Sequence, residues 1–232
     1  MFTEVLLEKV DSTHLHAVRE AEKGVKESLF FYAHTQTHGI GRKGDAWIAS
    51  GFENILGTFL FTLPQGLPLH NLGQLLAYAI ITVLEKEGFV PLFKWPNDIL
   101  LTYKKVSGIL CTIKGDKAIV SYGLNVNMKR ETLELIPIKA TSLFAESQRT
   151  FSLEKLRRLI NEAFTKDLRI FCTEGFTPFF PRLAKKLAFI EKSAVIEGEA
   201  GVIKGLSPDG RLIFEKNGAP HLLTSGSLEI WQ

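Results

Sequence analysis

Two stretches of the chain repeat apolar residues with the period of a helix that faces a core. Between residues 72 and 84, leucine, alanine, isoleucine and valine recur at i, i+3, i+4, i+7 and i+8. Gly88 follows this run and suits the positive φ at which many helices end. A second run, over 153–171, has its apolar residues on one side and Ser152 in position to cap its N-terminus. The pattern predicts two amphipathic helices.

Short apolar runs rich in β-branched and aromatic residues predict strands. They are bounded by turn-forming residues, as strands usually are. The last two runs flank a short turn at residues 114–117, which predicts a β-hairpin. The expected strands cover residues 29–33, 55–63, 91–94, 106–113 and 118–124.

The pattern changes at about residue 188. From there on, short β-like pieces alternate with turn signals such as Glu197-Gly198, Asn217-Gly218 and Ser225-Gly226. Dense turns without a helical run are typical of a small β-barrel. We therefore expect a catalytic domain of mixed α and β structure at residues 1–187 and an all-β domain at residues 188–232.

Composition narrows the class of protein. The 232 residues are 45% hydrophobic and 23% charged, with a net charge of +3, which excludes disordered and collagen-like chains. The two cysteines, Cys111 and Cys172, stand apart, so we expect neither a disulfide framework nor a zinc site, and we expect a cytoplasmic protein. Polar residues interrupt the uncharged run at 54–84, and charges occupy the N-terminus. We therefore expect neither a membrane span nor a signal peptide.

A glycine-rich segment at residues 39–44 (GIGRKG) satisfies the dinucleotide-binding pattern G-x-G-x-x-G. That fold needs a helix at this point and an acidic residue about 20 positions later, and neither follows. Two interpretations remain open for the segment. It is an anion-binding loop, in which Arg42 and Lys43 add charge, or a flexible surface loop.

Three further segments carry polar residues where strands begin or end. Residues 94–98 (KWPND) follow a short apolar strand, residues 105–110 (KVSGIL) open another, and residues 123–127 (GLNVN) close a third. Each also has an ordinary structural explanation as a turn, a charged strand start or a cap. The segment at residues 11–13 (DST) likewise fits a helix cap.

The order and spacing of these segments together are more specific than any one of them. Read along the chain, they resemble biotin–protein ligase, and the resemblance covers essentially the whole sequence. KWPND followed by KxxGIL is its most specific part. The resemblance implies an α+β fold. Its mixed-sheet catalytic domain would be like that of class II aminoacyl-tRNA synthetases, with a C-terminal SH3-like β-barrel.

The family resemblance also implies a two-step reaction. Biotin is activated by ATP as biotinyl-5′-AMP and is then transferred to one lysine of a biotin carboxyl carrier protein, a domain of acetyl-CoA carboxylase. Joining two anions requires positive charge at the reacting atoms, and Mg²⁺ would neutralise the triphosphate. The expected substrates and cofactors are thus biotin, ATP and Mg²⁺.

Site residues follow from the matching positions, each as an implication of the resemblance. Arg42, Lys94 and Lys105 are the expected catalytic residues, and Asp98 is the expected metal-linked one. The biotin set and the ATP set overlap at Arg42. Biotin contacts are expected from Ser12, Thr13, Gln36, Gly39, Arg42, Lys105 and Gly108, and ATP contacts from Arg42, Trp47, Lys94, Asn97 and Asn125.

Three positions depart from the family pattern. Family members usually have arginine where this chain has Ile40, often a basic residue at Asp45, and commonly asparagine at His14. The loop is therefore less cationic than expected, which puts tight retention of the adenylate in question. The DST segment begins at Asp11, so we expect neither a DNA-binding domain nor specific DNA binding. A homodimer is also among the expectations.

Other functions have less support in the sequence than the ligase. A lipoate or octanoate ligase shares the superfamily, but this chain lacks the Arg-Arg-x-Ser-Gly-Gly-Gly signature of those enzymes. A biotin-binding module with degraded catalysis would account for Ile40 and Asp45. A nucleic-acid binder has the least support, because no basic motif interleaved with aromatic residues is present.

Overall fold

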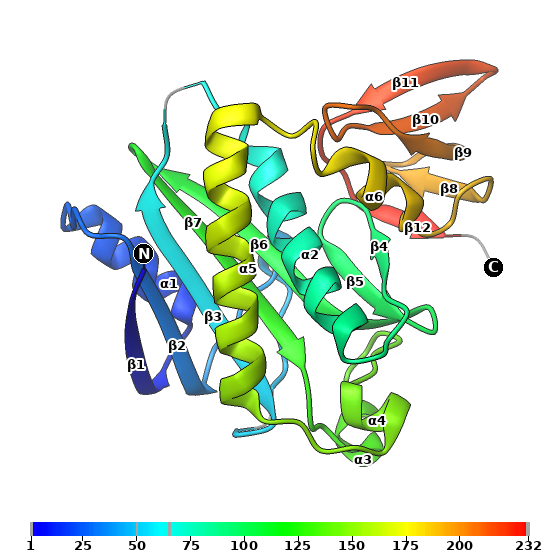
Figure 1. The fold of residues 1–232 in the computed structure, drawn as a ribbon. Helices are drawn as coiled ribbons and strands as arrows, with labels where there is room; N and C mark the ends of the chain where they lie inside the picture. Colours follow the sequence, from blue (N-terminus) through cyan, green and yellow to red (C-terminus); the bar gives the residue numbers. More distant parts are fainter. Residues whose placement is uncertain (1, 50, 65, 231–232) are drawn as a thin grey trace.

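The computed structural model describes residues 2–49, 51–64 and 66–230. Most of the chain builds a seven-stranded mixed sheet with the order β1-β2-β3-β7-β6-β5-β4 (Figure 1). β1 pairs with β2 in parallel, and the other neighbours pair antiparallel. The strands are β1 (Thr3–Val10), β2 (Leu29–Gln36), β3 (Asn54–Thr62), β4 (Leu92–Lys94), β5 (Asp98–Leu101), β6 (Lys104–Lys114) and β7 (Lys117–Asn125).

Helices cover both faces of this sheet (Figure 1). α1 (Thr13–Glu22) packs against β3 and β7 on one face, and α2 (Leu69–Lys86) and α5 (Leu153–Glu174) pack together on the other. Successive strand residues point to opposite faces, so Phe30 joins the large core under α2 and α5 while Phe31 joins the small core under α1. The alternation of bulky residues along β2 thus serves two cores.

Both predicted helices are confirmed and are longer than the apolar runs that indicated them. α2 ends before Gly88, which has a φ of +92°. The side chain of Ser152 accepts a hydrogen bond of 3.2 Å from the backbone N–H of Lys155, as an N-cap should. The described residues also contain three short α-helices and one 3₁₀ turn: α3 (Arg130–Leu133), α4 (Leu143–Ser147), α6 (Phe180–Lys185) and η1 (Arg42–Gly44).

The five strands expected in this part of the chain are present, and the predicted hairpin is the β6–β7 pair with Lys114 opposite Lys117. Two strands were not predicted. β1 carries charged residues and lies at the edge of the sheet, and β5 begins inside the KWPND segment, for which the sequence indicates a turn or a ligand site but no strand. That segment makes the turn at residues 95–97 and then enters β5 at Asp98.

The C-terminal residues form a separate antiparallel sheet with the order β11-β10-β9-β8-β12 (Figure 1). Its strands are β8 (Ser193–Ile196), β9 (Glu199–Leu206), β10 (Leu212–Lys216), β11 (Ala219–Leu223) and β12 (Leu228–Ile230). The expected domain boundary at residue 187/188 falls between α6 and β8, and it stays a prediction.

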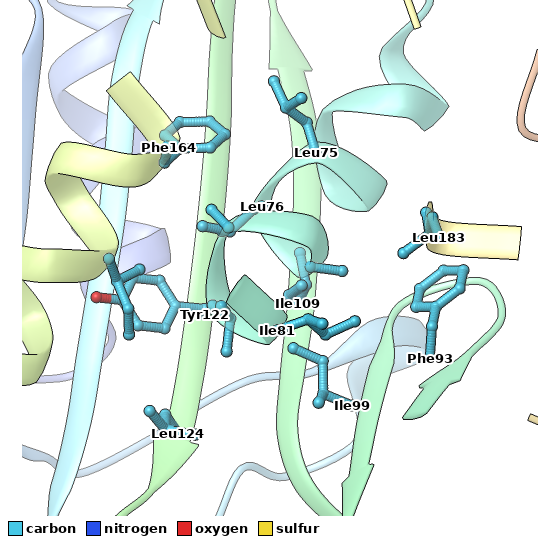
Figure 2. Close-up of a cluster of buried hydrophobic side chains, with 14 of the residues drawn as sticks. Leu75, Leu76, Ile81, Phe93, Ile99, Ile109, Tyr122, Leu124, Phe164 and Leu183 are labelled. Atoms are coloured by element: carbon cyan, nitrogen blue, oxygen red, sulfur yellow. The ribbon is translucent and has the colours of Figure 1, made fainter. Parts of the chain in front are cut away.

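The large core runs without a break from α5 to the C-terminal sheet. Figure 2 shows Leu76 of α2 beside Tyr122 and Ile109 of the mixed sheet, and Leu75 farther along in the same cluster. The core continues past β4 and α6, and it includes Ile203 and Phe214 of the C-terminal sheet. The two sheets therefore share one apolar core.

Across the described part of the chain, no helix combines the length and the apolar character that a membrane span needs.

Candidate active site

One cavity of about 1020 Å³ gathers the segments that the sequence analysis singled out. It lies between the mixed sheet, the loop at residues 40–48 and residues 227–230 of the C-terminal sheet. Segments far apart in the sequence thus meet at one place. The predicted site residues that line it are Ser12, Thr13, Gln36, Arg42, Trp47, Lys94, Asn97, Asp98, Lys105, Gly108 and Asn125.

Gly39 is the one predicted site residue that does not line the cavity. It lies behind the wall, where a Cβ atom would meet the backbone oxygen of Trp47 at 2.6 Å and Nε2 of Gln36 at 2.9 Å. Its role in this structure is to let the loop return close to β2. The direct ligand contact expected at Gly39 stays a prediction.

The glycine-rich loop is closed on itself by backbone hydrogen bonds. Gly41 N–H donates to the carbonyl of Asp45 at 2.7 Å, and Trp47 N–H donates to the carbonyl of Gly39 at 2.9 Å. Lys43 and Gly44 have φ values of 55° and 85°, so the loop turns through the left-handed region. Part of the N–H set expected for anion binding is thus engaged within the loop in this conformation.

The indole of Trp47 rests on a glycine floor in the cavity. Gly108 of β6 and Gly123 of β7 are paired in register, and Cβ atoms there would meet the indole at 2.9 Å and 2.2 Å. Only residues without a side chain allow an aromatic ring to lie this close to the sheet. The buried Nε1 of Trp47 has no hydrogen-bond partner in the described part of the chain.

Three cations converge on the cavity. Nζ of Lys105 lies 2.7 Å from Oδ1 of Asp98. Arg42 donates from Nη1 to the carbonyl of Gly226 at 2.9 Å and to Oδ1 of Asn97 at 3.3 Å. Lys94, at the end of β4, lines the same cavity. Lys105 and Arg42 are therefore each paired with protein oxygen atoms inside the cavity. A bound anion would compete with these oxygen atoms for the two cations.

The two predicted asparagines are fixed by the backbone. Asn97 donates from Nδ2 to the carbonyl of Ile109 at 2.8 Å, which ties the KWPND turn to β6. Asn125 is buried and donates to the carbonyl of Thr141 at 3.0 Å. Its Oδ1 has no partner among the described residues, so it is free to accept a hydrogen bond from a ligand.

The donor set for a metal is small. Among the described residues, no group of three or more His, Cys, Asp or Glu side chains could hold an ion. Asp98 offers one carboxylate, which is paired with Lys105. Such a set fits a magnesium ion that arrives on substrate phosphates, since those ions need one or two carboxylates at most from the protein. A resident metal site does not fit, and the metal role of Asp98 stays a prediction.

Of the DST segment, Ser12 and Thr13 line the cavity and Asp11 does not. Asp11 lies outside the cavity lining, and its hydrogen bonds to the Arg19 guanidinium hold the pKa of its carboxyl at about 2. Ser12 caps α1, and Thr13 donates from its backbone N–H to Oε1 of Gln36 at 2.7 Å. The helix cap is therefore confirmed for this segment, and its role in ligand binding stays a prediction.

A family model described as the biotin/lipoate A/B protein ligase family matches residues 7–127. The match covers more than half of the chain and includes every motif on the mixed sheet. The chain belongs to this family. The α+β fold class expected from the sequence is confirmed by the structural neighbours below.

Curated relatives are similar over most of the chain. The bifunctional ligase/repressor BirA of Escherichia coli is 27% identical over 92% of this chain and 69% of its own length. The biotin–[acetyl-CoA-carboxylase] ligase of Paracoccus denitrificans is 27% identical over 90% of this chain and 92% of its own. The solved biotin protein ligase of Aquifex aeolicus, in complex with biotin and ATP, is 26% identical, with a TM-score of 0.90 and full coverage of both chains.

The departures from the family pattern lie in this same cavity. Ile40, Asp45 and His14 all line it. The backbone of Ile40 pairs with that of Ala46 in an antiparallel bridge across the base of the loop. The buried ring of His14 bonds to Ser121 and Thr112.

Sequence reasoning missed Ser121 and the carbonyl of Gly226, and it marked Gly123 only as part of the GLNVN segment, without its contact to Trp47. Ser121 lies inside an apolar strand, and no local signal marks it. Gly226 was noted only as a turn, and its contact with Arg42 spans 184 positions.

Proposed function

We propose that this chain is a biotin–protein ligase that forms biotinyl-5′-AMP from biotin and ATP and transfers the biotinyl group to a lysine of a carrier protein. The observation that carries the proposal is the convergence of Arg42, Lys94 and Lys105 on one cavity. Ser12, Thr13 and Gln36 line the same cavity. Such a cavity offers apolar walls, a few placed polar groups and concentrated positive charge.

In the first step, a carboxylate oxygen of biotin bonds to the α-phosphorus of ATP. The bond from that phosphorus to the bridging oxygen breaks, and pyrophosphate leaves. Negative charge builds up on the α-phosphate, and fixed cations stabilise it without reorganisation at the moment of reaction. Lys105 and Arg42 now rest on Asp98 and Gly226. We propose that the α-phosphate replaces these protein oxygen atoms as the partner of Lys105 and Arg42.

In the second step, the ε-amine of the carrier lysine attacks the acyl carbon of the mixed anhydride, and AMP leaves. The amine must be deprotonated to attack, and its proton is released to water or to a nearby base. Trp47 covers the floor of the cavity at Gly108 and Gly123. We propose that the indole stacks on the adenine from this floor, as the family resemblance implies.

Biotin is favoured over lipoate or octanoate as the acyl group. The family model covers biotin and lipoate ligases, but the Paracoccus denitrificans relative and the solved Aquifex aeolicus structure are named as biotin ligases. The intact Arg42, Lys94 and Lys105 favour an enzyme over a catalytically degraded binding module. The carrier domain, the cytoplasmic location, a homodimer and the absence of specific DNA binding stay predictions.

The test is an incubation with ATP, Mg²⁺ and labelled biotin, with and without a biotin carboxyl carrier domain. We expect pyrophosphate release with biotin alone and label on one carrier lysine when the domain is added. Parallel reactions with lipoate and octanoate should release no pyrophosphate. Binding of biotin without pyrophosphate release would contradict the ligase and support a binding module. Release with lipoate alone would reassign the substrate.

A further inference from the structure

A line of buried polar side chains begins at Gln36 on the cavity wall. Oε1 of Gln36 accepts two hydrogen bonds from Thr13, one from the backbone N–H at 2.7 Å and one from the hydroxyl at 2.9 Å. The hydroxyl of Thr58, which is fully buried on β3, lies 2.9 Å from that of Thr13. The backbone N–H of Thr13 can only donate, so it identifies the Gln36 atom as the amide oxygen.

The line continues through β7 to His14 and ends on β6. Oγ of Ser121 lies 2.9 Å from the Thr58 hydroxyl and 2.7 Å from Nδ1 of His14. Nε2 of His14 lies 3.0 Å from Oγ1 of Thr112. The line thus joins α1 to β2, β3, β7 and β6.

Each hydroxyl has a single proton, and counting the protons fixes their direction. The Thr13 hydroxyl donates its proton to Gln36, so the Thr58 hydroxyl must donate to Thr13. Ser121 must therefore donate to Thr58, because the Thr58 proton is already used. With its own proton spent, Ser121 can only accept from His14.

The same counting assigns the protons of His14. Nδ1 must carry a hydrogen in order to donate to Ser121. Burial lowers the pKa of His14 to about 4, so the ring is neutral near pH 7 and has one N–H. Nε2 is therefore a lone-pair acceptor, and the Thr112 hydroxyl donates to it.

This direction determines what the cavity wall presents to a ligand. Thr13, His14, Gln36 and Ser121 line the cavity, whereas Thr58 and Thr112 lie behind it. Every hydroxyl proton in the line points toward Gln36. Thr13 and Ser121 therefore offer their remaining lone pairs to the cavity, and the Gln36 amide offers its NH₂ group. Such a wall fits a compact ring that carries N–H donors beside a carbonyl acceptor, such as a cyclic urea.

We propose that His14 is a positioning residue, which, as the Nδ1–H tautomer, sets the direction of this hydrogen-bond line and so orients Thr13, Ser121 and Gln36 for the ring of the substrate. The proposal deepens the proposed function and rests on it for the identity of that ring. His14 acts through Ser121 and need not touch the reacting carboxylate.

The tautomer is measured without any ligand. We expect the ¹⁵N spectrum of histidine-labelled protein at pH 7 to show one ring with a protonated Nδ1 and an unprotonated Nε2. The signal is assigned to His14 by its absence from His14→Asn. An Nε2–H tautomer, or equal populations of the two, would overturn the proposal. This result does not depend on catalysis.

Steady-state kinetics tests the consequence for the substrate. His14→Ala removes the donor to Ser121 and the acceptor for Thr112, and we expect its KM for biotin to rise by about 5- to 10-fold, the worth of a neutral hydrogen bond. Its KM for ATP and its kcat should stay within about 2-fold, because the cations are not part of the line. His14→Asn keeps one donor and one acceptor, so it should restore most of the affinity.

Two more variants keep the test decisive. Thr112 lies outside the cavity lining, and Thr112→Val removes the hydroxyl that donates to Nε2 of His14. We expect this variant to raise the KM for biotin by about 2- to 5-fold. It tests the proposal even if His14→Ala does not fold. His16→Asn is the matched control on the same helix, where the ring contacts Phe31 outside the cavity, and it should leave both KM values unchanged. An unchanged KM for biotin in folded Thr112→Val and His14→Ala contradicts the proposal. Failure of the wild type to bind biotin contradicts the proposed function instead.

Discussion

Lys105 is held at the cavity by a single acidic partner. Its Nζ lies 2.7 Å from Asp98, both side chains are about four-fifths buried, and the Trp47 ring lies 5.6 Å away. A cation placed this way is fixed before substrate arrives. Removing one such group from the point where charge develops slows the chemistry far more than it weakens substrate binding.

We expect Lys105→Ala to lower the rate of pyrophosphate release by about 10²–10³-fold while the protein still folds. The measurement is biotin-dependent pyrophosphate release, with the thermal unfolding midpoint recorded beside it. Lys114→Ala is the control, because Lys114 lies on the same strand and pairs with Glu22 at the surface. Near-normal release by a folded Lys105→Ala protein would reject the role of this lysine.

His14 also makes stability depend on pH. Burial lowers the pKa of its imidazole from 6.5 to about 4, so the unfolded chain binds a proton more readily than the folded one. The stabilising contribution is fully present above pH 6.5 and is lost as the pH falls toward 4. We expect the free energy of unfolding to drop by on the order of 2 kcal/mol between pH 7 and pH 5 from this group.

The measurement for His14 is urea unfolding of the wild type and of His14→Asn at both pH values. The difference between the two proteins isolates His14, because other buried groups act in other directions. Asp167, for example, has its pKa raised to about 6 by burial, which favours the folded state at lower pH. The wild type should lose more stability than the variant between pH 7 and pH 5, and equal losses would show that His14 is not buried as a neutral base.

At the scale of elements, periodic burial made the long helices and the β6–β7 hairpin predictable. α2 and α5 each bury a continuous stripe, and the short turn between Lys114 and Lys117 leaves one antiparallel pairing for the strands beside it. β1 was not predictable in this way, because Glu4, Glu8 and Lys9 interrupt its apolar residues at the edge of the sheet. β5 was hidden by the turn residues Pro96 and Asn97 that precede it.

The site was predictable as a set of motifs but not as a network. Thr58 and Ser121 stand directly opposite each other in the β3–β7 register, and this pairing places their hydroxyls in contact. A sequence pattern assigns each residue to a strand and a face, but it does not say which strands are neighbours. For that reason the partners of His14 and the contact between Arg42 and Gly226 came only from the structure.

The glycine floor under Trp47 belongs to the β6–β7 pair and yields a test at this scale. We expect Gly123→Ala to push the indole off the sheet, because the new Cβ would lie 2.2–2.6 Å from three indole atoms. The indole is the movable partner, so the unfolding midpoint should change little while the tryptophan emission shifts and ATP binding weakens.

The control for the floor is Gly123→Ala combined with Trp47→Phe, in which a smaller ring removes part of the conflict. The double variant should bind ATP better than Gly123→Ala alone. If Gly123→Ala has the emission spectrum and ATP affinity of the wild type, the indole does not rest on this floor in solution.

For the whole molecule, the C-terminal sheet is a wall of the cavity as well as a separate sheet. Residues 227–230 line the cavity, Arg42 bonds to Gly226, and Lys43 pairs with Glu197 at 3.1 Å. Away from the cavity, Asn71 and Gln74 of α2 donate hydrogen bonds to backbone carbonyls of the β9–β10 turn. The position of this sheet therefore bears on the geometry of the glycine-rich loop.

Gln74 is the buried link in this attachment. Its Nε2 donates to the carbonyl of Gly210 at 2.6 Å, while its Oε1 accepts from Asn71 at 2.9 Å. Gly210 has a φ of +83°, and a Cβ there would lie 2.2 Å from Oε1 of Gln74, so the turn fits against α2 closely. Gln74→Ala leaves the Gly210 carbonyl buried without a donor, which costs about 1–3 kcal/mol.

We therefore expect Gln74→Ala to lower the free energy of unfolding by about 2 kcal/mol, and to speed amide hydrogen exchange at residues 207–211 more than in the β3–β7 pair. Such a pattern marks local loosening of the attachment on top of global destabilisation. His70→Ala is the control, since His70 contacts the carbonyl of Asp209 in the same turn at an exposed position and should cost less than about 1 kcal/mol. If Gln74→Ala matches the wild type in urea midpoint and exchange, the shared apolar core alone holds the C-terminal sheet in place. If the sheet does loosen, biotin-dependent pyrophosphate release should fall with it, because Arg42 loses the fixed carbonyl that positions it before the phosphate arrives.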